Sequence, residues 1–230
     1  MAKKTFQIAI DGPVGAGKST VAKLVAERLQ ILYVDTGAMY RAVALYMKRN
    51  GVSWEDEEAI SQRLSELTIT LSRPVDDQVD GRNVTVTLNG EDVSWEIRKA
   101  DMGEGASVVS QYQAVRKKLV SLQQQLATNI SVIMEGRDIG TKVLPKAQTK
   151  IYLDAGVQER ARRKLEQSVK LGHGITFEAA VKDVETRDAR EMGRKIDPLR
   201  PAEGAWMLNT TGLSITQVVD RIVERVSGEL

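Results

Sequence analysis

The chain has 230 residues, with 33 Lys and Arg against 31 Asp and Glu, and 42% of its residues are hydrophobic. This balance is typical of a water-soluble protein and excludes a bilayer-spanning one, because no apolar run approaches the ~20 residues that a membrane helix needs. The absence of cysteine excludes disulfides, zinc–thiolate sites and cysteine nucleophiles, and a cytoplasmic location is expected.

The size of the chain favours one domain with appendages over two independent domains. We expect a monomer that binds small molecules. Nucleic acid is not an expected partner, since Lys and Arg are dispersed along the sequence rather than gathered in one tract.

A phosphate-binding P-loop pattern, G-x-x-x-x-G-K-[ST], follows the first apolar run, which we expect to be a strand over 6–10. The matching residues are Gly12, Pro13, Val14, Gly15, Ala16, Gly17, Lys18, Ser19 and Thr20. The pattern predicts a nucleoside triphosphate whose outer phosphates contact Lys18 and whose Mg²⁺ is ligated by the Ser19 hydroxyl. The alternative is a Gly-rich turn capped by Ser19, but apolar residues at helical spacing follow the loop, as the motif requires.

The next segments predict a second strand over 31–34 and then a helix that Thr36 caps. A helix over 54–67 with Ser53 as its cap is expected next. From about 68 to 95 the period changes to alternation, and the pair Asn89-Gly90 is a tight-turn signal. We therefore expect a small antiparallel sheet inserted between helices.

The rest of the chain continues the α/β pattern. We expect helices from 97 to about 128, strands over 131–134, 149–153 and 205–208, two Arg-rich helices over 159–171 and 177–192, and a closing helix over 215–226. The predicted fold class is α/β, with a parallel five-stranded sheet flanked by helices.

Arginines stand at the ends of many predicted elements, namely Arg41, Arg116, Arg137, Arg160, Arg163, Arg187 and Arg194. A guanidinium group binds phosphate in a bidentate manner, so this set fits phosphoryl transfer between two anionic nucleotides. An acceptor phosphate with a second pKa near 6 is its own nucleophile and needs no general base. The sequence agrees with a reaction that needs no base, because its single histidine, His173, is expected to be a solvated turn residue.

Several segments resemble bacterial cytidylate kinases. They are residues 12–20, Asp35-Thr36-Gly37-Ala38-Met39-Tyr40-Arg41, Glu135-Gly136-Arg137-Asp138-Ile139-Gly140, 150–154 with Glu159-Arg160-Ala161, and Arg187-Asp188. The resemblance covers nearly the whole chain, including the β insert. It implies an α/β P-loop kinase fold with an acceptor-binding arm over about 36–100 and a helical lid over about 158–194. It also implies transfer of the γ-phosphoryl group of ATP to CMP or dCMP, in pyrimidine metabolism and with Mg²⁺ as cofactor.

The resemblance also implies site residues. Those around CMP are Thr36, Tyr40, Arg41, Ser107, Arg116, Arg137, Asp138, Arg187, Glu191 and Arg194. Catalytic roles fall to Lys18, Arg137, Arg160 and Arg163, and metal binding to Ser19 and Asp35.

Two carboxylates depart from the family pattern, because Glu135 and Glu191 stand where Asp is usual. They leave open whether the acceptor carries ribose or deoxyribose, and the basic run after Arg160 leaves open which arginine meets the transferred phosphoryl group. Two other functions stay open: a kinase for another monophosphate or small metabolite, and a nucleotide-dependent switch or scaffold bound to RNA or ribosomes.

Overall fold

The computed structural model describes residues 5–75, 80–82, 84–99, 101–170 and 174–228. His173 and most of the turn predicted over 172–174 lie outside these ranges. The chain divides into two compact units, a larger one made of Met1–Tyr33 and Ala127–Leu230 and a smaller one made of Val34–Leu126. No helix in the described ranges has the length and apolar character to cross a membrane.

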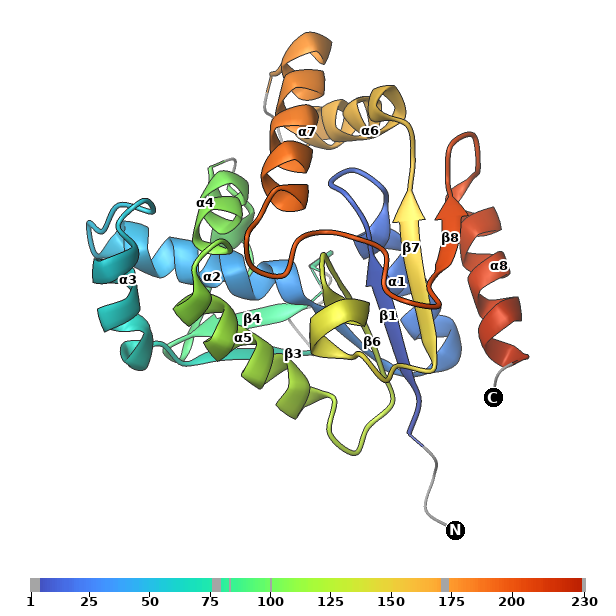
Figure 1. Ribbon diagram of the computed structural model, residues 1–230, viewed down its shortest axis with the longest axis horizontal. Helices are drawn as coiled ribbons and strands as arrows, with labels where there is room; N and C mark the ends of the chain where they lie inside the picture. Colours follow the sequence, from blue (N-terminus) through green and yellow to red (C-terminus); the bar gives the residue numbers. More distant parts are fainter. Residues whose placement is uncertain (1–4, 76–79, 83, 100, 171–173, 229–230) are drawn as a thin grey trace. The chain divides into compact units, whose positions relative to one another are not determined.

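The larger unit is built on a five-stranded parallel sheet, which confirms the predicted fold class (Figure 1). Its elements are β1 (Gln7–Asp11), α1 (Lys18–Leu29), β6 (Val132–Gly136), the π-helix η4 (Ile139–Val143), β7 (Thr149–Asp154), α6 (Val157–Lys170), α7 (Phe177–Met192), β8 (Trp206–Asn209) and α8 (Ile215–Ser227). The strand order is β2-β6-β1-β7-β8, where β2 (Leu32–Asp35) leads from the larger unit into the smaller.

The central position of β1 determines where the loops of the larger unit meet. Asp11, the last residue of β1, is paired with Gly136 at the end of β6 and with Tyr152 near the end of β7. Because the strands are parallel, the chain leaves all three at the same edge of the sheet. The P-loop and residues 135–138 therefore share that edge, as predicted.

An apolar core lies between the sheet and the helices α1 and α8. Ile8 and Ile10 of β1 are fully buried in it, together with Ile222 and Val226 of α8. The strand is buried along nearly its whole length, which is why its sequence is an apolar run without alternation. This core holds the sheet edge in place.

The helices α6 and α7 pack against each other and form a helical pair beyond the end of β7 (Figure 1). Ala161, Ala180 and Val184 are buried between them. Thr176 begins α7, because its hydroxyl oxygen accepts a hydrogen bond from the Ala179 N–H at 3.2 Å. The two predicted Arg-rich helices are thus present, and their closure as a lid stays a prediction.

The smaller unit contains the predicted β insert. Its elements are α2 (Thr36–Arg49), α3 (Glu57–Arg63), the 3-10 helix η1 (Leu64–Glu66), β3 (Ile69–Ser72), β4 (Thr85–Leu88), β5 (Glu91–Asp92), the 3-10 helix η3 (Glu96–Arg98), α4 (Met102–Val109) and α5 (Gln113–Leu126). The strands form an antiparallel sheet in the order β3-β4-β5. Asn89 and Gly90 connect β4 to β5 with φ of 51° and 88°, the left-handed pair that a two-residue hairpin needs.

Two predicted helix caps are wrong, for the same physical reason. The helix expected from residue 54 begins at Glu57, because the Asp56 carboxylate accepts from the Ala59 N–H at 3.0 Å, while the Ser53 hydroxyl bonds Glu55. Similarly, Asp35 rather than Thr36 caps α2. A nearby carboxylate caps a helix end as well as a hydroxyl does and adds a favourable interaction with the helix dipole.

The helical stretch predicted from 97 to about 128 is divided into η3, α4 and α5. Helix α4 ends at Val109, next to Ser110, whose hydroxyl donates to the Ser107 carbonyl at 3.0 Å. Such a local side-chain bond competes with helix continuation. Hydrophobic periodicity alone did not predict this break.

Candidate active site

The P-loop joins β1 to α1, and its glycines are placed where side chains do not fit. Gly15 and Gly17 have φ of 77° and 92°, in the left-handed region. A Cβ on Gly12 would lie 2.0 Å from the Leu153 carbonyl oxygen, so the loop approaches β7 too closely for any larger residue. The strand, loop and helix expected around the motif are confirmed.

Lys18 is buried at the start of α1, and its ammonium group donates to the Pro13 carbonyl at 2.8 Å. Burial and the nearby Arg137 cation together lower the pKa of Lys18 to about 7, against the opposite effect of Glu135, Glu191 and Asp11. In the free protein this amine is therefore charged or neutral in similar amounts near neutral pH. A phosphate beside it would favour the charged form.

ATP binding is expected to take up about one proton at pH 8. Lys18 is then mostly neutral in the free protein, since the pH exceeds its pKa of about 7, and phosphate oxygens raise that pKa on binding. ATP affinity should fall up to about tenfold per pH unit above 7 and level off below it. Titration calorimetry with ATP in EDTA, in two buffers of different ionisation enthalpy, measures the uptake. Equal heats in both buffers would contradict the expectation.

Ser19 has a carboxylate neighbour in the larger unit. Its hydroxyl donates to Glu135 Oε1 at 2.7 Å, and the Tyr33 hydroxyl lies 3.4 Å from the same oxygen. A hydroxyl and a carboxylate are the hard oxygen donors that Mg²⁺ prefers. Two donors of this kind fit an ion whose remaining ligands are phosphates and water. Within the described ranges no three or more His, Cys, Asp or Glu residues group into a metal site.

Arg137 and Glu191 lie near Lys18, and Arg187 lies beside Glu191. Arg137 Nε donates to Glu191 Oε2 at 2.5 Å, and Arg187 Nη2 lies 3.9 Å from Glu191 Oε1. Burial by itself would raise the pKa of Glu191, but the Arg137 and Arg187 cations outweigh it and hold that pKa below its usual value. The buried carboxylate thus stays ionised and orients two guanidinium groups.

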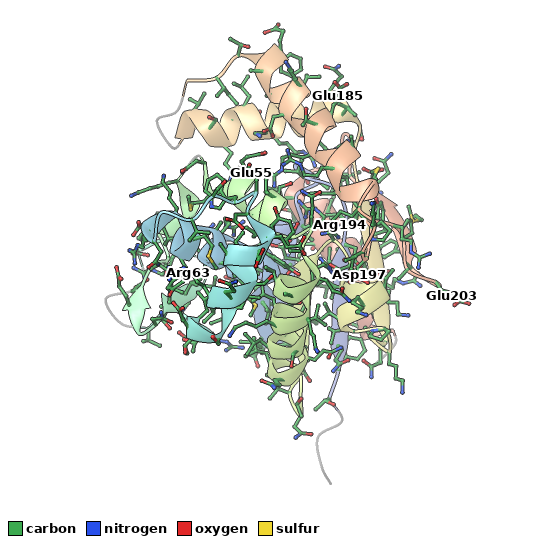
Figure 2. The ribbon with its side chains drawn as sticks, turned by 60° about the vertical axis from the view of Figure 1, so that its left-hand side comes forward. Glu55, Arg63, Glu185, Arg194, Asp197 and Glu203 are labelled. Atoms are coloured by element: carbon green, nitrogen blue, oxygen red, sulfur yellow. The ribbon has the colours of Figure 1, made fainter. Side chains whose placement is uncertain are left out.

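Arg194 lies just beyond α7, at the start of the segment that leads to β8 (Figure 2). Its Nη2 donates to the Asp197 carbonyl at 2.5 Å, and the residue is buried. The predicted acceptor arginines of the larger unit therefore come from three places: Arg137 directly follows β6, Arg187 lies on α7, and Arg194 lies in the segment after α7.

Asp11 and Asp138 are buried at the same sheet edge. The Asp11 carboxylate accepts from the Ile139 N–H at 2.6 Å and from the Gly140 N–H at 2.7 Å. Burial raises the pKa of Asp11 to about 7, and the two backbone hydrogen bonds oppose that rise. Asp11 thus fixes the turn that carries Arg137 and Asp138. Sequence reasoning missed this residue, although an acidic residue ending a buried apolar strand was a usable signal.

Arg160 and Arg163, expected to be catalytic, lie on α6 and donate to backbone carbonyls of the P-loop. Arg160 Nη1 bonds the Val14 carbonyl at 3.2 Å, and Arg163 Nη1 bonds the Ala16 carbonyl at 3.3 Å. Their contacts therefore lie with the loop itself.

In the smaller unit, Asp35 and Arg41 form one pair of predicted residues. Asp35 Oδ1 accepts from the Ala38 N–H at 2.9 Å, and Oδ2 accepts from Arg41 Nη2 at 2.8 Å. Burial would raise the pKa of Asp35, but the Arg41 and Arg98 cations outweigh it and lower that pKa. Both oxygens of Asp35 have protein partners, and its predicted role as a metal ligand stays a prediction. Arg98 was not predicted.

Tyr40 and Arg116 form the second pair in the smaller unit. Arg116 is buried, and its Nη1 lies 3.4 Å from the Tyr40 hydroxyl and 3.4 Å from the Ser110 carbonyl. Ser107, on α4, is also buried, as is Thr36 at the start of α2. A buried guanidinium group anchored in this way offers fixed donors to a ligand.

The sequence matches the family model described as Cytidylate kinase over residues 8–228. A cytidylate kinase from Caldanaerobacter subterraneus subsp. tengcongensis is 46% identical, over 98% of this chain and 96% of that protein. Cytidylate kinases from Leuconostoc mesenteroides and Bacillus subtilis are 44% and 43% identical, covering 98% and 97% of this chain and equal shares of their own.

One solved structure supports the fold. An uncharacterized protein from Eubacterium ventriosum is similar with a TM-score of 0.55 at 12% identity, over 98% of this chain and 99% of that one. At this identity the likeness concerns the fold alone.

Proposed function

The chain belongs to the cytidylate kinase family. We propose on this basis that it transfers the γ-phosphoryl group of ATP to CMP or dCMP, giving CDP or dCDP and ADP. The observation that carries the proposal is the P-loop lysine, Lys18, buried beside Arg137 and Glu191 in one unit. A donor polyphosphate and an anionic acceptor both need cations at this place.

The reaction needs positioning and charge stabilisation more than proton transfer. An oxygen of the CMP phosphate attacks the γ-phosphorus of ATP, and the bond from that phosphorus to the bridging oxygen breaks as ADP leaves. The acceptor phosphate is largely dianionic at neutral pH, so no protein base removes a proton. Lys18 and Arg137 stabilise the charge on the transferring group.

Ser19 and Glu135 are the residues proposed to hold Mg²⁺ in the larger unit. Their oxygens lie 2.7 Å apart, so one ion can draw on the hydroxyl directly and on the carboxylate directly or through water. When bound, Mg²⁺ neutralises phosphate charge and orients the β- and γ-phosphates.

Cytosine recognition is assigned to Asp138 of the larger unit and, separately, to Arg116 and Ser107 of the smaller unit. The base presents an amino group as donor and ring acceptors, which a carboxylate and a guanidinium group complement. Arg187 and Glu191 are proposed to face the sugar, and Thr36, Tyr40, Arg41 and Arg194 to border the acceptor. Closure of the helical pair α6–α7 would exclude water, so that transfer is favoured over hydrolysis.

An acceptor panel tests the proposal. ADP formation is measured with ATP and Mg²⁺ and with CMP, dCMP, UMP, AMP or GMP in turn. CMP or dCMP is expected to react fastest, and the purine nucleotides are expected to react more slowly by orders of magnitude. Equal rates on all five acceptors would rule out recognition of cytosine, and slow ATP hydrolysis unaffected by any acceptor would rule out a kinase.

A further inference from the structure

The backbone carbonyls of the P-loop have partners on α6. In a phosphate-binding loop of this kind the N–H groups converge on the anion, so carbonyl groups that point elsewhere need other donors. The Val14 carbonyl accepts a hydrogen bond from Arg160, and the Ala16 carbonyl accepts one from Arg163. The two arginines lie about one turn apart on α6.

Arg160 is 4% exposed and has almost all of its donors occupied within the protein. Nε bonds the Ala155 carbonyl at 2.8 Å, Nη1 bonds the Val14 carbonyl at 3.2 Å and Asp188 at 3.0 Å, and Nη2 bonds Asp188 at 2.6 Å. A guanidinium group has five N–H donors, and these four bonds leave one. Asp188 compensates its charge and ties α6 to α7.

Arg163 is held in the same manner from the next turn. Nε bonds Glu159 at 2.9 Å, Nη1 bonds the Ala16 carbonyl at 3.3 Å and the Thr210 hydroxyl at 3.0 Å, and Nη2 bonds the Thr210 carbonyl at 3.0 Å. The Thr210 hydroxyl also lies 3.4 Å from the Ala16 carbonyl oxygen. The segment after β8 thus joins α6 in holding this point of the loop.

Packing fixes the same contact independently of hydrogen bonds. The Val14 side chain packs against the apolar cluster between α6 and α7. A Cβ on Gly15 would lie 2.8 Å from the Arg160 carbonyl oxygen and 2.9 Å from the Arg160 Cβ, so helix and loop are in direct contact there. The loop therefore lies against α6 along residues 14–16.

We propose that Arg160 and Arg163 are positioning residues, which hold the P-loop carbonyls of Val14 and Ala16 so that its N–H groups keep the geometry that binds the polyphosphate of the donor. They act through the loop on ADP and ATP alike and do not contact the transferred γ-phosphoryl group. This replaces the catalytic role expected from sequence, and it rests on the proposed function in taking ATP as the donor.

Three ligands distinguish this role from the alternatives. If the arginines contacted the γ-phosphoryl group, their replacement would weaken the binding of ATP but not of ADP. If they contacted adenine, their replacement would weaken the binding of ADP and ATP but not of inorganic tripolyphosphate. Positioning of the loop affects all three by the same factor, while the affinity for CMP stays unchanged.

The experiment uses the full chain and measures dissociation constants for ADP, ATP, tripolyphosphate and CMP by titration calorimetry, together with KM and kcat. The test variants are Arg163→Lys, which keeps the charge but loses the planar fork, and Arg160→Lys. The control is Arg162→Gln on the same helix, because the Arg162 side chain is 62% exposed against 25% for Arg163.

Arg163→Lys is expected to weaken the binding of ADP, ATP and tripolyphosphate each about tenfold, which corresponds to the loss of about one charge-assisted hydrogen bond. CMP affinity and kcat at saturating substrates should change less than about threefold, and Arg162→Gln should match the wild type. Because Arg160 belongs to a buried ion pair, Arg160→Lys risks misfolding, and Arg163→Lys then decides alone.

The proposal is overturned if ATP alone weakens, if tripolyphosphate binding is unchanged, or if kcat falls about 100-fold with ADP affinity intact. Unchanged affinities throughout would overturn it as well. A wild-type protein that binds ATP and tripolyphosphate but does not phosphorylate CMP would instead contradict the proposed function, so the two failures are separable.

Discussion

Replacing Lys18 by alanine is expected to lower turnover by about 10²- to 10³-fold, the loss that follows removal of one charge-stabilising donor in a closed site. The amine donates to the Pro13 carbonyl of its own loop and lies near Glu135, Arg137 and Glu191, so it adds little to the apolar core. We expect it to contact the phosphates of a bound donor. The ADP-forming assay with CMP measures the effect.

The same variant is expected to fold as well as the wild type. The pKa of Lys18 is lowered to about 7, mainly by burial. The charged amine therefore lowers the stability of the folded protein at acidic pH. A melting temperature equal to or above that of the wild type should accompany the lost turnover. Lys23→Ala, on the exposed side of α1, is the matched control and should keep full activity. Turnover within tenfold of the wild type would contradict the P-loop assignment.

Replacing Asp138 by asparagine is expected to lower kcat/KM for CMP by about 100-fold and to leave ATP affinity within about twofold. The reason is that a carboxylate accepts hydrogen bonds with both oxygens, whereas an amide replaces one acceptor by an NH₂ donor. That donor would face the amino group of cytosine, which is itself a donor. Uracil carries a carbonyl where cytosine carries the amino group, so the preference for CMP over UMP should shrink further.

Steady-state kinetics with CMP, UMP and ATP as varied substrates check this prediction. Asp220→Asn is a suitable control, because Asp220 is an exposed carboxylate of the same unit that pairs with Arg28 on the surface. A variant at Asp138 with unchanged discrimination among bases would remove this residue from the cytosine site.

The sheet and the P-loop were predictable because their signals are local. A buried strand reads as an apolar run, and the glycines at 15 and 17 stand where left-handed backbone is required. The hairpin at Asn89-Gly90 was predictable on the same grounds. Such features depend on a few adjacent residues, so spacing is enough to find them.

The contacts of the site were harder to predict, because they depend on side-chain direction across the sheet edge. Asp11 hydrogen-bonds residues 139 and 140, more than a hundred positions away. Glu135 was noted only as a departure from a family pattern, yet it accepts the Ser19 hydroxyl bond. Arg160 and Arg163 were predicted to be catalytic from residue type and from the family resemblance, and neither tells a group that touches phosphate from one that holds the loop.

The smaller unit is organised around apolar residues of its own. The described core that contains Met39, Val86 and Leu119 shares no member with the one that contains Ile10, Ile133 and Ile222. Substitutions in the interior of the smaller unit can therefore accumulate in evolution without disturbing the apolar core that supports the P-loop.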